Sequence, residues 1–196
     1  MKRAGLSLVE LLIAVALMVL LSLSLYGYWS KSSQERQKAL CQKNLQLIYM
    51  AIKIYADENR GYFPAVDQAG TAEVPLSLLV PRYTASTGIF ICPGSRDAAL
   101  PEAQSFASRR ISYAYYMGLT TQAPATQPLL SDRQVGTTAK IRDQLVFSPD
   151  GRPPGNNHYE FGGCFLFADG HVESSPPHAT RDLPLPHGVV LLNPRP

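Results

Sequence analysis

Residues 1–29 read MKRAGLSLVELLIAVALMVLLSLSLYGYW, and this stretch decides the fold. No charged side chain follows Glu10 within it, and only Ser22 and Ser24 dilute the apolar run. About 20 consecutive apolar residues are enough for a helix to span a bilayer. The sequence therefore predicts a transmembrane and assembly helix over residues 6–29.

Two features separate this helix from an ordinary secretory signal. Glu10 lies just inside the apolar run, where an unpaired carboxylate costs about 2.5–3.5 kcal/mol, so we expect it to have a cationic partner. The short basic leader Lys2-Arg3-Ala4-Gly5 stands before the apolar run, whereas secretory cleavage sites follow it. Both features indicate a different processing pathway.

The octapeptide Gly5-Leu6-Ser7-Leu8-Val9-Glu10-Leu11-Leu12 resembles the prepilin signal of type IV pilins and type II secretion pseudopilins. The resemblance implies that a prepilin peptidase cleaves between Gly5 and Leu6 and that the new amino terminus on Leu6 is N-methylated. It also implies assembly with other pseudopilin subunits into a helical filament on an inner-membrane platform. Leu6 stands where Phe is the usual first mature residue.

The resemblance gives Glu10 a role in assembly. Cleavage creates an ammonium group on Leu6, and in a filament the Glu10 carboxylate of one subunit can meet the amine of a neighbour. Removing either partner would leave a buried charge uncompensated, so pairing favours the correct axial register. The alternative is that Glu10 only marks the interfacial end of a signal anchor and reaches the lipid headgroups.

The charges around the apolar run bear on its orientation. Lys2 and Arg3 favour a cytoplasmic amino end, but Lys31, Arg36 and Lys38 lie on the far side, so charge alone leaves the topology open. The prepilin resemblance then implies a single-pass inner-membrane protein with a periplasmic carboxyl-terminal domain, assembled in a pseudopilus. The net charge of +3 is too small to indicate a polyanion partner.

The helix is expected to continue past the membrane as an amphipathic half over residues 30–60. Its apolar positions step by four and three, which is one helical stripe: Cys41, Leu45, Ile48, Ile52 and Tyr55. The sequence Asn59-Arg60-Gly61 predicts its end, because glycine accepts the left-handed geometry of a helix C-cap.

The remaining residues, 61–196, predict one globular pseudopilin domain behind the leader of residues 1–5. Strands are expected at 88–92, 111–118, 128–132, 144–147 and 189–192, with a helical turn at 75–83. Cys164 to Ser174 predicts a hairpin with a two-residue type I′ turn at Asp169-Gly170. The fold class predicted is α+β and pilin-like, with a long N-terminal helix packed on a small antiparallel sheet.

The end of the domain carries a second resemblance. Together with Cys41-Gln42-Lys43-Asn44-Leu45 and Cys92-Pro93, residues 158–173 resemble pseudopilin-like proteins with a prepilin-processing-associated tail, in which a His precedes Asp-Gly by a fixed span. Here the span from His158 to Asp169 is one residue too long, and the usual histidine position falls on Tyr159.

The three cysteines, Cys41, Cys92 and Cys164, have no CxxC spacing, which disfavours a zinc or redox motif. Our hypothesis is a disulfide between Cys41 and Cys92, since it would fasten the long helix to the domain and contribute about 3–4 kcal/mol in the chain-entropy model. The alternative is three reduced, buried cysteines that act as small apolar residues.

Metal sites find little support in the sequence, and no cofactor is expected. His158, Asp169 and His171 form the one cluster with metal-ligand character, but Asp169 is explained by the turn. Calcium is the better candidate, because major pseudopilins resemble this architecture and hold calcium in a carboxyl-terminal loop. Hard oxygen ligands for it could come from Asp150, Asn156, Asn157 and Asp169.

Other functions remain as alternatives. The chain has no GxSxG, HExxH or P-loop motif, so we expect no enzyme, and a signal-anchored extracytoplasmic enzyme is the least favoured reading. An adhesive pilin is a further alternative. A DNA-uptake pilin is suggested by Arg109-Arg110 followed by Tyr113, Tyr115 and Tyr116, which mix cations with stacking rings.

Overall fold

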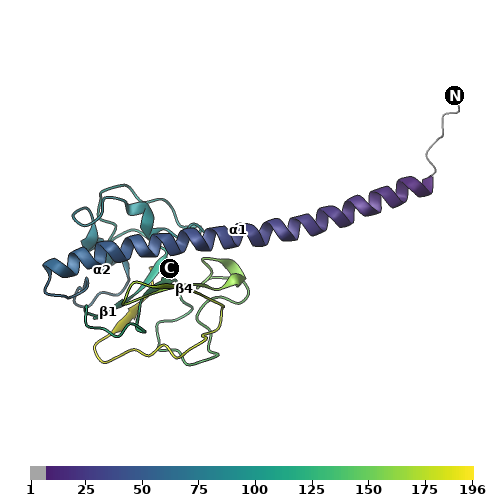
Figure 1. Ribbon diagram of the computed structural model, residues 1–196. Coiled ribbons are helices and arrows are strands. Elements are labelled where there is room, and N and C mark those ends of the chain that lie inside the picture. Colours follow the sequence, from purple (N-terminus) through teal and green to yellow (C-terminus); the bar gives the residue numbers. More distant parts are fainter. Residues whose placement is uncertain (1–7) are drawn as a thin grey trace. The chain divides into compact units, whose positions relative to one another are not determined.

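The computed structural model describes residues 8–196, with residues 25–31 described by their backbone alone, and is shown in Figure 1. Its longest element is helix α1, Leu8–Glu58. The chain divides into two compact units, Met1–Arg36 and Gln37–Pro196, and α1 contributes to both. The predicted cleavage site at Gly5 and Leu6 lies outside the described residues.

Helix α1 ends where the sequence predicts, but Arg60, and not only Gly61, adopts the left-handed conformation of the cap. Gly61 N–H donates to Ala56 O (2.8 Å), the long-range bond of a Schellman cap. The residue before it, Arg60, takes the left-handed position with φ 57°, and Gly61 follows with φ 83°. Gly61 therefore completes the cap, while Arg60 bears the backbone strain.

The second unit contains one antiparallel sheet in the order β4-β3-β2-β1-β5. Its strands are β1 (Tyr113–Met117), β2 (Pro128–Asp132), β3 (Gly163–Phe167), β4 (Val172–Ser175) and β5 (Val190–Leu192). In the register of the two central strands, Tyr113 pairs with Asp132 and Tyr115 with Leu130. Three of these strands, β1, β2 and β5, were predicted as such, and the predicted hairpin is β3 and β4.

Three local predictions were wrong. Residues 88–92 contain the 3-10 helix η2, Thr87–Phe90, and no strand. Residues 144–147 form no strand; Leu145 makes a single bridge with His178. The hairpin turn has three residues, 168–170, because Phe167 N–H donates to His171 O (3.0 Å) and Gly170 N–H to Phe167 O (2.9 Å). Of the Asp-Gly pair, only Gly170 has a positive φ, which fits a type I turn with a bulge.

Short helices complete the second unit: α2 (Glu73–Leu76), η1 (Ser77–Leu79) and η3 (Tyr159–Phe161). In Figure 1 the part of α1 that belongs to this unit lies across the sheet. Its buried stripe comprises Cys41, Leu45, Ile48, Ala51, Ile52 and Ala56, which join the main core with side chains of β1, β2 and β5. The predicted α+β fold, a long N-terminal helix on a small antiparallel sheet, is confirmed.

Candidate functional site

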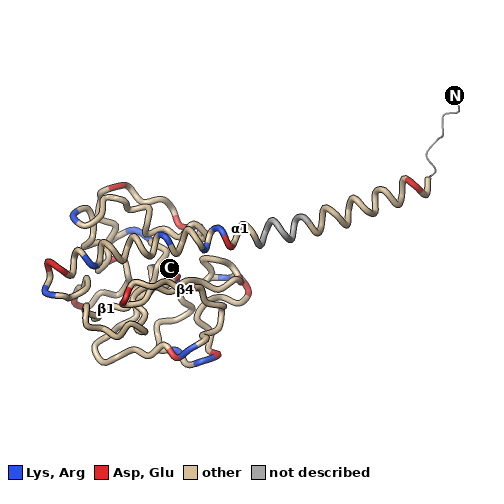
Figure 2. The backbone as a smooth tube through the Cα atoms, in the orientation of Figure 1, with Lys and Arg blue, Asp and Glu red and all other residues tan. Residues whose placement is uncertain are grey.

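The N-terminal part of α1 carries the predicted assembly residue. Glu10 lies exposed in the first turn of the described helix. From Leu11 to Ser24 no charged residue follows it, as Figure 2 shows. Large apolar side chains between Leu11 and Ser24 are exposed in the isolated chain, up to 64 % for Leu20 and Leu23. Such a continuous apolar surface marks a site of protein or membrane contact.

A search of the described residues for a helical stretch both long and apolar enough to cross a membrane finds none. The predicted span over residues 6–29 therefore stays a prediction.

A second candidate site lies in the core of the other unit. Cys41, Cys92, Asp132 and His158 are each 0 % exposed, and their ligand atoms all lie within 4.8 Å of one another. These four residues are called the buried quartet below. They come from segments far apart in the sequence, so the fold alone brings them together.

Different elements position each member. Cys41 belongs to the buried stripe of α1, and Asp132 is the last residue of β2. Cys92 follows η2 in a tight turn, where Ser95 N–H donates to Cys92 O (2.9 Å). Asn44, one helical turn beyond Cys41, donates from Nδ2 to Ile91 O (3.1 Å). That bond holds the Cys92 turn against α1.

His158 directly precedes η3, and its ring packs against the Cys92 turn at Gly94. A Cβ atom on residue 94 would lie 2.6 Å from His158 Nδ1 and 2.4 Å from Asn157 O. Only glycine allows this approach, because real Cβ atoms do not come so close to backbone oxygen. The local sequence Cys92-Pro93-Gly94 therefore serves the packing of the histidine.

Asp132 is the best-anchored member of the quartet. Its Oδ1 accepts a hydrogen bond from Asn157 Nδ2 (2.7 Å), and its Oδ2 accepts one from the backbone N–H of Cys164 (2.7 Å). Asn157 also donates to Ser112 O (2.8 Å), which fixes the amide. Burial opposes ionisation of Asp132, but the charge of His158 and these donors outweigh it and lower its pKa.

His158 presents one nitrogen to two partners. Its Nε2 lies 3.3 Å from Cys92 Sγ and 3.4 Å from Asp132 Oδ2, while Nδ1 is buried without a hydrogen-bond partner. Burial lowers the pKa of His158, yet the charge and hydrogen bond of Asp132 prevail and raise it to about 10. A catalytic triad uses both ring nitrogens, one for the nucleophile and one for the acid. The arrangement is therefore not that of a Cys-His-Asp protease.

The surroundings of the Cys41 and Cys92 thiols shift their pKa values in opposite directions. Burial raises the pKa of Cys41, which donates to Tyr113 Oη (3.4 Å) and lies 3.4 Å from Asp132 Oδ1. Burial also opposes ionisation of Cys92, but hydrogen bonds with Cys41 and His158 lower its pKa. The quartet thus places a thiol with a lowered pKa next to an imidazole with a raised pKa in a water-excluded core.

The predicted disulfide partners are neighbours, but no bond joins them. Cys41, Cys92 and Cys164 are all buried free thiols. Cys41 and Cys92 hydrogen-bond to other members of the quartet instead, and the disulfide stays a prediction about an oxidised form. The third cysteine, Cys164, contributes its backbone N–H to Asp132 and lies outside the set of ligand atoms.

The metal-ligand cluster of His158, Asp169 and His171 that the sequence suggested does not form. His158 is in the buried quartet, whereas Asp169 Oδ1 accepts from His171 N–H (3.0 Å) within the hairpin turn. The turn therefore accounts for Asp169, as expected, and separates it from His158.

The four calcium candidates have different partners. Asp150 accepts from Ser148 Oγ (2.8 Å), Asn156 donates to Gly151 O (3.2 Å), and Asn157 is bound to Asp132. Asp169, the fourth, is held in the hairpin turn. Calcium binding by this set stays a prediction.

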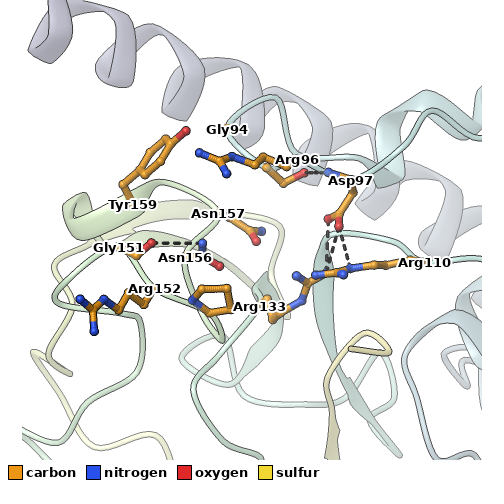
Figure 3. Close-up of a pocket in the computed structure, with 12 residues that line it drawn as sticks. Gly94, Arg96, Asp97, Arg110, Arg133, Gly151, Arg152, Asn156, Asn157 and Tyr159 are labelled. Atoms are coloured by element: carbon orange, nitrogen blue, oxygen red, sulfur yellow. Dashed lines mark hydrogen bonds and ion pairs between the residues drawn. The ribbon is translucent and has the colours of Figure 1, made fainter.

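A polar pocket of about 240 Å³ lies beside the quartet, and one of its lining residues is Asn157, which donates to Asp132 of the quartet (Figure 3). Asp97 is paired in it with Arg110 (2.7 Å) and Arg133 (3.3 Å) and accepts from Ser112 Oγ (2.7 Å). The pocket also contains Arg96 and Arg152. No cysteine or histidine is among its lining residues.

The tyrosines of the DNA hypothesis are unavailable for stacking. Tyr113, Tyr115 and Tyr116 are all buried, and Arg110 of the adjoining pair is engaged by Asp97. The structure therefore removes the aromatic half of that hypothesis.

Comparison with known proteins identifies one feature. Residues 1–26 match the family model described as the prokaryotic N-terminal methylation motif. No curated protein and no solved structure matched the chain. The amino terminus thus carries a type IV pilin-like prepilin signal, as the octapeptide beginning at Gly5 predicts.

Sequence reasoning missed the buried quartet. The spacing of the cysteines argued against a metal motif, and the tail spacing put His158 in doubt. One available signal was Asp132, a carboxylate at the end of the apolar segment 128–131, where a buried partner is required.

Proposed function

We propose that this protein is a non-enzymatic structural subunit of a type II secretion pseudopilus or a related type IV pilus-like filament. A prepilin peptidase would cleave after Gly5 and methylate Leu6, and α1 would join neighbouring subunits at the inner membrane. The observation that carries this proposal is the N-terminal methylation motif over residues 1–26. The α+β fold with a long N-terminal helix supports it.

The exposed apolar face of α1 supports assembly through this helix. From Leu8 to Ser24 every side chain is exposed, and leaving so many large apolar groups in water is unfavourable by up to about 1.5–3 kcal/mol each. Lipid before assembly and neighbouring subunits after it would remove that surface from water. An assembly platform and its separate cytoplasmic ATPase would do the mechanical work.

Processing is tested at the cleavage junction. Gly5→Ala should block the peptidase and leave the basic leader in place, whereas Leu6→Phe should be processed normally, because Phe is the usual residue there in the signals this one resembles. Mass spectrometry of the native amino terminus measures both. A mature chain that begins with methylated Leu6 supports the proposal, and a Gly5→Ala protein trimmed to normal length would contradict it.

Assembly is tested at Glu10. Glu10→Ala should leave cleavage intact and impair filament formation, because the Leu6 ammonium of a neighbouring subunit would lose its carboxylate partner. Glu35→Ala is the matched control, since it removes an exposed acid from the same helix. Filaments counted by electron microscopy should be lost only with Glu10→Ala. Equal filament numbers in both variants would remove the pairing role.

A further inference from the structure

We propose that the buried quartet, Cys41, Cys92, Asp132 and His158, binds one zinc ion as a closed structural site. The proposal goes beyond filament assembly and does not depend on it. Two sulfur ligands, one imidazole and one carboxylate form a donor set of the kind that zinc accepts in four-coordinate sites. Calcium is disfavoured, because it takes oxygen ligands.

The distances within the quartet agree with four ligands around one zinc ion. With ordinary zinc bond lengths, tetrahedral ligands lie apart by about 3.6 Å for sulfur and nitrogen or oxygen, and by about 3.4 Å for nitrogen and oxygen. Cys92 Sγ and His158 Nε2 are 3.3 Å apart, Cys41 Sγ and Asp132 Oδ2 3.6 Å, and Asp132 Oδ2 and His158 Nε2 3.4 Å. One atom of each side chain therefore faces a common centre.

The same distances fit a salt bridge poorly. A charge-assisted bond between imidazolium and carboxylate is about 2.7–2.9 Å long, whereas Asp132 Oδ2 and His158 Nε2 are 3.4 Å apart with both side chains fully buried. In addition, Nε2 faces a thiol and a carboxylate at once. A single N–H shared by both would make only a long, bifurcated hydrogen bond, whereas a nitrogen lone pair directed at a shared metal satisfies the whole arrangement.

The groups around the quartet suit a metal site with excess negative charge. Two thiolates and a carboxylate outweigh the charge of Zn²⁺ by one unit, and binding releases to solvent the protons that the two thiols and the His158 imidazolium carry in the metal-free protein. Asn157 and the N–H of Cys164 donate to Asp132. Tyr113 Oη lies 3.4 Å from Cys41 Sγ and can donate to it once the thiol is ionised. Such outer donors orient ligands and tune metal affinity.

A site of this kind has a structural role. All four ligands come from the protein and are fully buried, whereas catalytic zinc keeps an open position for water or substrate. The ion would join α1 through Cys41 to the Cys92 turn, to β2 through Asp132 and to the segment before η3 through His158. It takes the place that a Cys41–Cys92 disulfide was expected to fill.

The test starts from the full-length protein purified without chelator. Elemental analysis should find about one zinc per chain, and exchange for Co²⁺ should give thiolate-to-cobalt charge-transfer bands with the ligand-field bands of tetrahedral cobalt. Zinc below about 0.1 per chain after loading with excess Zn²⁺ would overturn the proposal. A Cys41–Cys92 disulfide found by non-reducing peptide mapping would overturn it too.

Variants assign the ligands. Cys92→Ser should weaken zinc binding by more than about 100-fold and remove charge-transfer intensity. Cys164→Ser is the matched control, because this cysteine is equally buried but outside the quartet, and His171→Ala is the control for histidine. Equal loss in a control and in Cys92→Ser would contradict the assignment. If Cys92→Ser fails to fold, the cobalt spectrum of the wild-type protein decides, since it reports sulfur ligands and tetrahedral geometry directly.

Discussion

Replacing Gly170 in the β3–β4 turn by alanine should destabilise the protein by about 2–3 kcal/mol. Gly170 has φ 93°, and a left-handed conformation costs an L-residue about 1–2 kcal/mol. A Cβ there would also lie 2.4 Å from Tyr49 Cε1 on α1. The Tyr49 ring would have to move, and its hydroxyl would lose the bond that it donates to Ala168 O (3.0 Å), which contributes about 1 kcal/mol.

Two other glycines separate these costs. Gly188→Ala carries backbone strain alone, since its φ is 81° and nothing lies within 4 Å of the added Cβ, so it should cost about 1–2 kcal/mol. Gly70→Ala carries neither strain nor clash and should be neutral or slightly stabilising. In a Tyr49→Ala background the clash disappears, and Gly170→Ala should cost no more than Gly188→Ala.

Urea denaturation followed by circular dichroism measures these free energies of unfolding, with comparison restricted to variants that keep the same slope against urea. If Gly170→Ala and Gly188→Ala cost the same in the wild-type background, the close contact between the hairpin and α1 contributes nothing, and the reasoning fails.

Two further predictions concern buried polar groups. Burial raises the pKa of Tyr116 to about 12, partly offset by the hydrogen bond from Gln134. In the unfolded chain the pKa of tyrosine is about 10, so the difference contributes about 3 kcal/mol to the free energy of unfolding. This contribution is complete below pH 10 and is lost as the pH rises through 12. Tyr116→Phe should therefore flatten the alkaline fall in unfolding free energy, measured by urea titration at several pH values. Asn157→Ala should weaken zinc binding by about 10–100-fold with unchanged stoichiometry, measured by chelator competition, because Asp132 loses a donor; wild-type affinity would contradict this.

The long elements could be predicted because each carries its own periodic signal. The stripe from Cys41 to Ile52 identifies the docked half of α1, and alternation or turn residues identify β1 and the hairpin. The segment 88–92 is a short apolar run, for which periodicity cannot separate a strand from a turn of helix. Val146 and Phe147 both donate their N–H to Pro177 O, but Pro177 lacks the N–H donor that a ladder needs in return.

The two functional sites differ in how they are encoded. The processing signal is contiguous, so the residues from Gly5 to Leu12 can be interpreted without any structure. The buried quartet has no local pattern, because its members are placed by the crossing of α1 over the sheet and by two loops. Rules on cysteine spacing detect ligands that share a turn or a hairpin, and Cys41 and Cys92 share neither. His158 lies at this site although its distance from Asp169 departs from the tail pattern.

Two kinds of interaction hold the docked part of α1, and they are separated along the helix. Toward its end, burial of Leu45, Ile48 and Ile52 contributes about 5–9 kcal/mol, and this does not depend on pH, metal or redox state. Near the start of this part the contacts are polar: Lys38 donates to Phe161 O and to Ser174 Oγ (3.3 Å), and Cys41 belongs to the quartet.

It follows that zinc is not needed to dock α1, because the apolar stripe is sufficient for that. Its effect would fall on the turns around Cys41, close in sequence to Gln37, where the second unit begins. Loss of the ion would loosen this end of the docked helix while the Leu45 to Ile52 stretch stays packed. The proposed zinc site would therefore keep α1 ordered near the start of the second unit, whereas the apolar stripe accounts for the docking of the helix on the sheet.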